Sequence, residues 1–104
     1  MKTTLEKIRS LEQIYIEGYE DSFLDRALHK IVAHQLARDE ADLRTLRADL
    51  DEFERRYSLS SDEFFHRYRQ GQMSDEADFV EWHALYRMYT KLRTRLNILQ
   101  GQSV

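Results

Sequence analysis

The sequence contains no cysteine, no proline and only three glycines among its 104 residues. Without cysteine the chain cannot form disulfides, thiolate zinc sites or a cysteine nucleophile. The shortage of proline and glycine argues against the many tight turns that a β-sandwich or β-barrel requires. No apolar run approaches the ~20 residues that span a bilayer, and the first residues lack the apolar core of a signal peptide. We therefore expect a helical, cytoplasmic protein that does not enter membranes.

What the sequence has in quantity is charge. Charged residues make up 34% of the chain and hydrophobic residues 41%, so a modest core is available beneath a highly charged surface. A chain of this length corresponds to one small domain. We predict a single all-helical domain over residues 1–104, with no linker and no internal repeat.

Capping signals divide the chain into helices. Thr3 to Glu6 fits a capping box, which predicts a first helix over 4–17. Asp21 and Ser22 open a second helix that continues to Tyr57 without a glycine or proline. A helix of that length would extend ~54 Å, whereas a compact 100-residue domain is only ~35 Å across. The long helix must therefore bend, protrude or be covered by a second copy of the chain.

Two further helices follow the long one. Ser60 and Glu63 form a second capping box, which predicts a short helix that ends at Gly71. Ser74 opens a last helix that Gly101 closes. The fold class is therefore all-α, with a long helical hairpin of about 21–57 with 75–99 and two short helices, completed by dimerisation.

The long helix carries a heptad pattern. Leucine or tyrosine recurs every seven residues from Leu36 to Tyr57, an interleaved series runs from Val32 to Phe53, and Asp39 interrupts it. We expect Asp39 to lie at the edge of this stripe. Such a stripe is typical of coiled-coil-like homodimers. The predicted self-association residues are Leu36, Leu43, Leu46, Leu50 and Phe53.

Charge is unevenly distributed in the second half of the chain. Residues 57–81 contain six acidic and two basic residues, whereas residues 82–104 contain four basic residues and no acidic one. One interpretation is that the acidic start and basic end of the last helix suit its macrodipole. The other is that an acidic surface meets a basic partner. Direct nucleic-acid binding through 87–95 is a weaker hypothesis, because the sequence pI is about 5.8 and such domains usually exceed ~9.

Nine aromatic residues fall within residues 53–89. They suit a ring-rich core where three helices meet, but some of them would also suit an exposed binding hot spot. On the second interpretation, the acidic start of the last helix and the rings beside its stripe would contact a basic partner with an apolar pocket. The predicted partner-binding residues are Asp75, Asp78, Phe79, Glu81, Tyr86 and Arg93.

Signals for chemistry are weak. Glu63 and His66 have the Glu-x-x-His spacing of di-metal bundles, but those bundles need the motif twice. Three isolated glycines do not make a phosphate-binding loop. The serines at positions 22, 60 and 74 are explained as helix caps. We predict no enzyme activity, no catalytic residue, no metal and no cofactor.

One stretch resembles a known group of proteins. Residues 53–64 (Phe-Glu-Arg-Arg-Tyr-Ser-Leu-Ser-Ser-Asp-Glu-Phe), followed by Gly71 and by Asp-Phe-Val-Glu-Trp at 78–82, resemble small helical bacterial and cyanobacterial proteins of about 100 residues. Some members of that group look like antitoxin components of toxin–antitoxin pairs. The sequence departs from the group at Ser58, where the others have glycine in a turn. The resemblance implies no catalytic or ligand residues.

Three functional hypotheses follow. The first is an antitoxin-like, protein-binding module that neutralises a basic toxin by direct contact. The second is a self-associating structural protein without a toxin partner. The third is a weak nucleic-acid binder that uses residues 87–95.

Overall fold

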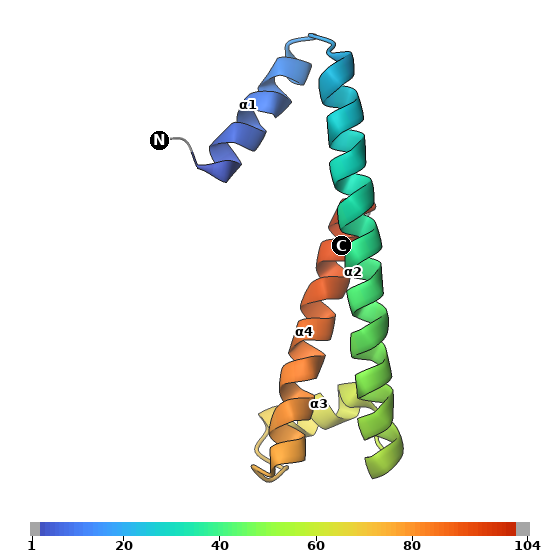
Figure 1. The fold of residues 1–104 in the computed structure, drawn as a ribbon. Helices are drawn as coiled ribbons and strands as arrows, with labels where there is room; N and C mark the ends of the chain where they lie inside the picture. The colour runs from blue at the N-terminus through green and yellow to red at the C-terminus, as the bar shows by residue number, and fades with distance from the viewer. Residues whose placement is uncertain (1–2, 102–104) are drawn as a thin grey trace. The chain divides into compact units, whose positions relative to one another are not determined.

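The computed structural model describes residues 3–101 and forms an all-α fold (Figure 1). Its elements, in chain order, are α1 (Thr4–Ile16), α2 (Ser22–Tyr57), α3 (Ser61–Arg69) and α4 (Ala77–Leu99). No strand occurs within 3–101. The predicted all-α class and the long helical hairpin are therefore confirmed. No helix in this range is long and apolar enough to cross a membrane.

The backbone divides into two compact units, Met1–Ile31 and Val32–Val104. The boundary falls inside α2. Because a helix crosses it without interruption, no change of composition and no linker marks it in the sequence.

The first unit contains α1 and the start of α2. The Thr3 side chain accepts a hydrogen bond from the backbone N–H of Glu6, as the capping box predicts. The Tyr15 hydroxyl reaches the next helix, where it donates to Asp25 Oδ1 at 2.5 Å. That bond, with the carboxylate charges of Asp25 and Asp21, raises the pKa of Tyr15 to about 12. No side chain of α1 is buried, and Leu11, Leu24 and Ala27 are only half-buried, so this unit has no fully buried apolar core.

The second unit is an antiparallel hairpin. Figure 1 shows α4 (orange) running back along the C-terminal part of α2 (green), with α3 (yellow) beside their ends. Ring contacts between Tyr57 and Phe79 join the two long helices at one end. An ion pair between Asp39 and Arg95 joins them at the other.

The core of this unit is a stack of aromatic rings around Trp82. The indole lies between Phe64, at a centroid distance of 3.9 Å, and Phe53, at 5.6 Å, with all three rings nearly parallel. Leu50 and Phe79 complete the buried cluster. Burying each large side chain stabilises the fold by about 2 kcal/mol. The interpretation of the aromatic residues as a core where three helices meet is correct for these rings.

Helix ends agree with the capping signals, with one exception. Ser60 caps α3 through the backbone N–H of Glu63, and Ser58 adopts a left-handed φ of 52° at the end of α2. The exception is α4, which begins at Ala77 and not at 75. Its N-cap is Glu76, and no side-chain hydrogen bond caps it. The serine at 74 was therefore an incorrect start signal.

The heptad stripe of α2 packs within the chain. Leu46, Leu50 and Phe53 are buried against the other helices of the same unit, whereas Leu36 and Leu43 are half-buried. The prediction that this stripe joins two copies is therefore wrong for the three buried residues, because α3 and α4 cover them.

Asp39 also differs from expectation. It is buried and not at the edge of the stripe. Its Oδ2 lies 2.9 Å from Arg95 Nε, and its Oδ1 accepts a hydrogen bond from Gln35. The polar break in the heptad pattern is thus an ionic link to α4.

Candidate functional site

One carboxylate at the acidic start of α4, that of Asp78, is paired with side chains of α2. Asp78 Oδ2 accepts hydrogen bonds from Tyr57 Oη at 2.5 Å and from Arg56 Nη1 at 2.8 Å. The tyrosine hydroxyl, followed by the Arg56 guanidinium, holds the pKa of Asp78 below its usual range. This carboxylate serves to join α4 to α2, so it is not free for a partner.

The other predicted partner-binding residues lie in different environments. Phe79 is in the buried core, so its assignment as a contact residue is wrong. The Tyr86 hydroxyl is half-buried and donates to Asp62 on α3. Asp75, Glu81 and Arg93 are exposed, and the Arg93 guanidinium lies over the Tyr89 ring. The structure does not bring these six residues together in one surface.

A different set of side chains forms a hollow between α3 and α4. A shallow cavity of about 430 Å³ is lined by Phe65 and Arg69 from α3 and by His83 and Arg87 from α4. The His83 imidazole stacks on Phe65 at a centroid distance of 5.1 Å and on Tyr68 at 4.5 Å. We call the four lining residues, Phe65, Arg69, His83 and Arg87, the α3–α4 basic surface.

This hollow is electropositive. Within residues 3–101 no carboxylate lies within ion-pair distance of Arg69 or Arg87. Burial lowers the pKa of His83, and the charges of Arg87 and Arg69 lower it further. Near neutral pH the imidazole is therefore mainly neutral, and the two guanidiniums supply the positive charge.

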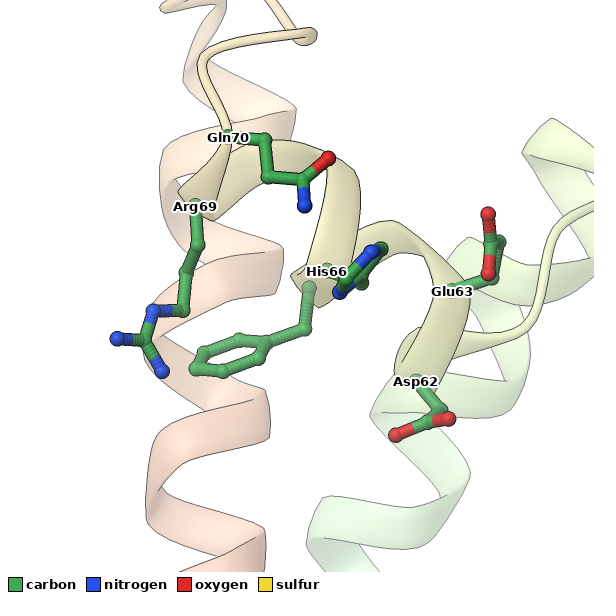
Figure 2. Close-up of a pocket in the computed structure, with 6 residues that line it drawn as sticks. Asp62, Glu63, His66, Arg69 and Gln70 are labelled. Carbon is green, nitrogen blue, oxygen red and sulfur yellow. The ribbon is translucent and has the colours of Figure 1, made fainter.

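The α3–α4 basic surface continues in two directions. A second hollow on α3 shares Phe65 and Arg69. Figure 2 shows Asp62 and Glu63 at its N-terminal end, with His66, Arg69 and Gln70 along the helix. Along α4, Arg87 also lines a shallow apolar hollow beside the exposed Met88 and Lys91. The whole band is open to solvent.

The side chains of this surface are of the kinds that hold an anionic group. The Arg69 guanidinium lies over the Phe65 ring, and Arg87 lines the same hollow. Two guanidiniums beside stacked rings match a carboxylate or phosphate group next to an apolar side chain. The described residues hold no group of three His, Asp or Glu side chains placed to bind a metal ion. The hollows are shallow, and no Ser or Thr nucleophile lines the α3–α4 basic surface.

Comparison with family models, with curated proteins and with solved structures finds no match to this chain. The resemblance to antitoxin-like proteins gains no support from these comparisons.

The sequence contained signals for this surface that its overall charge concealed. Phe65 and Arg69 are four residues apart on one helix, as are His83 and Arg87 on another, and residues at that spacing share a helix face. The sequence did not indicate that α3 packs on α4. The acidic average of residues 57–81 concealed the fact that Arg69 faces the basic helix.

Proposed function

We propose that this chain is a protein-binding module that uses the α3–α4 basic surface to contact a partner through direct side-chain interactions. The observation that carries the proposal is the pair Arg69 and Arg87, which lie around stacked rings without a carboxylate partner in the described chain. Arginine and aromatic residues dominate the energetics of protein interfaces. A matching partner presents carboxylates next to an apolar side chain.

The number of positive charges favours a protein over a nucleic acid. Arg95 is occupied by Asp39, and Asp62 and Glu63 border the hollow. Nucleic-acid affinity depends on neutralising many phosphates with Lys and Arg, but few free cations remain here. The partner chemistry differs from the sequence-based hypothesis of a basic partner, because Asp78 is paired within the chain.

Charge reversal tests this proposal. A tagged chain is purified from its native host after nuclease treatment, and the proteins that remain bound are identified by mass spectrometry. Three forms are compared: the wild type, Arg69→Glu with Arg87→Glu, and the control Arg38→Glu with Arg44→Glu. The control side chains are exposed on α2. Each variant replaces two arginines by two glutamates, so both change the net charge by the same amount.

The expected result is one stoichiometric protein that the wild type and the control retain and the Arg69/Arg87 variant loses. With purified components, the variant should raise the dissociation constant by about 30-fold or more, as expected for interface arginines. Equal retention by all three forms would refute the assigned surface. Retention of the partner only in a parallel purification without nuclease would indicate nucleic acid as the ligand, and the proposal would then be wrong.

In its most specific form, the proposal is that the partner is a growth-inhibiting protein and that this chain is its antitoxin. The motif resemblance over residues 53–82 supports that form. Expression of the captured partner alone should then slow growth, and co-expression of the wild-type chain, but not of the Arg69/Arg87 variant, should restore it. A growth-neutral partner would remove the antitoxin role and leave the binding module.

A further inference from the structure

The first unit exposes an unusual amount of apolar surface. Nine large hydrophobic side chains between residues 5 and 31 are 36% to 68% exposed. They come from α1, from the turn after it and from the start of α2. They are Leu5, Ile8, Ile14, Tyr15, Ile16, Tyr19, Phe23, Leu28 and Ile31.

The exposed area is sufficient for a stable interface. At ~90 Å² for each half-exposed large side chain, nine of them present on the order of 800 Å² of apolar surface. A standard protein–protein interface buries about 800 Å² from each partner. The summed exposed area of these side chains is of the size that one side of such an interface needs.

The helicity of α1 also requires a covering surface. It has 13 residues, and none of them is buried. Isolated helices shorter than about 12–15 residues are marginal in water, and most helical stability in proteins comes from packing of an apolar face. The Thr3 cap contributes only about 1 kcal/mol. Something must therefore pack on the stripe that includes Leu5, Ile8 and Tyr15.

The charge of this unit indicates what kind of partner packs on its apolar side chains. Residues 1–31 contain six acidic and five basic residues, so the unit is almost neutral with mixed signs. Membrane-surface helices instead concentrate Lys and Arg on their polar face. A strongly charged protein partner would likewise find no complementary field. A second copy of the same nearly neutral unit neither repels nor requires a charge match.

We propose that residues 3–31 form a homodimer interface in which the apolar helix pair of one chain packs against the same pair of a second copy. Two helices from each chain would make a four-helix arrangement with the apolar side chains inside. This interface takes the place of the α2 stripe that the sequence predicted, because the buried residues of that stripe pack against other helices of the same chain. It contains no residue of the α3–α4 basic surface.

The test is the solution mass of the full chain by sedimentation equilibrium at micromolar concentration. The wild type should have twice the 12.6 kDa of one chain. Ile8→Glu with Ile31→Glu should have the mass of one chain. Val80→Glu with Met88→Glu changes exposed apolar side chains in the second unit and should remain dimeric. Trp82, the only tryptophan, reports whether the second unit stays folded in each variant.

A cross-linking experiment gives an independent readout, because the native chain has no cysteine. Single substitutions Leu5→Cys, Ile8→Cys and Ile31→Cys, treated with a short bifunctional thiol reagent, should give covalent dimers from at least one position. Val80→Cys should not.

Three outcomes would overturn the proposal. The first is a monomeric wild type. A monomer that binds phosphatidylglycerol vesicles in a separate co-sedimentation assay would also overturn the proposal. The second is a dimer that survives the Ile8/Ile31 double substitution. The third is cross-linking from Val80→Cys alone. None of these results depends on whether the α3–α4 basic surface binds a partner, so the two proposals fail separately.

Discussion

Removal of one oxygen from the core should measurably destabilise the second unit. Trp82 Nε1 donates a hydrogen bond to Ser61 Oγ at 2.9 Å, and both residues are almost fully buried. Ser61→Ala keeps nearly the same volume but leaves the indole N–H without its partner. An unsatisfied buried donor costs about 1–3 kcal/mol. For a chain of about 100 residues this corresponds to a fall in melting temperature of roughly 4–8 °C for each kcal/mol.

The indole contribution can be separated by a double-mutant cycle. Trp82→Phe removes the N–H, so in that background Ser61→Ala should cost clearly less than in the wild type. All four proteins are unfolded with urea and monitored by circular dichroism at 222 nm, because two of them lack the indole fluorophore. The coupling free energy between the two sites should be about 1 kcal/mol or more.

Ser61 also has a second role that the cycle controls. Its backbone N–H donates to Glu54 Oε2 at 2.9 Å, and Glu54 is paired with Arg47. The Ser61 hydroxyl also helps to lower the pKa of Glu54. Alanine keeps the backbone donor and loses the hydroxyl in both backgrounds, so this contribution cancels in the coupling free energy. A loss below about 0.3 kcal/mol in the wild-type background, or an equal loss in both backgrounds, would refute the reasoning. The hydrogen bond would then contribute nothing net to stability.

Three further perturbations have defined outcomes. Ser58→Gly should raise stability by about 0.5–1 kcal/mol, since glycine adopts the left-handed φ of 52° without a Cβ penalty; an unchanged or lower urea midpoint would contradict this. Arg95→Met should lower the free energy of unfolding by about 1–2 kcal/mol, because it leaves the buried Asp39 carboxylate without its ion-pair partner. The loss stays at this modest size because the Arg95 side chain is itself half-exposed. Adding Asp39→Leu should recover most of that loss, and no recovery would mean that the pair is not the cause. Acidification should lower the urea midpoint, because the Tyr57 hydroxyl and the Arg56 guanidinium lower the pKa of Asp78. The stabilisation that Asp78 contributes is complete above its unfolded-state pKa of about 4 and is lost as the pH falls through its lower folded-state pKa. Asp78→Asn should therefore flatten the plot of urea midpoint against pH below about pH 4.

Local signals predicted most of the secondary structure. Capping residues and helix-stop glycines placed α1, α2 and α3 within a residue or two, because caps act over a single turn. The start of α4 was misplaced because Ser74 resembles a cap, whereas the helix begins after Glu76 without a side-chain cap. Ser58 ends α2 with a positive φ, a conformation that glycine adopts more readily than serine.

The candidate site was harder to predict because it depends on which helices pack together. Asp78 and Phe79 are adjacent in sequence, yet one is an ion-pair partner of α2 and the other a core residue. Their shared position at the acidic start of the helix suggested that both lie on the surface. Arg69 and Arg87 are 18 residues apart, and only the packing of α3 on α4 places them around one hollow.

The heptad stripe shows what sequence periodicity alone leaves open. A repeat of apolar residues every 3.5 positions indicates that a second helix lies along the first, but it does not indicate which chain supplies that helix. Here α4 supplies it, and the short α3 covers the end of the stripe through Phe64. The buried Asp39–Arg95 pair joins α2 to a specific side chain on α4. Intrachain packing therefore satisfies α2 from Leu46 onward and leaves the apolar residues near the N-terminus without a partner. That end of the chain is where we propose that a second copy binds, and the heptad pattern does not reach it.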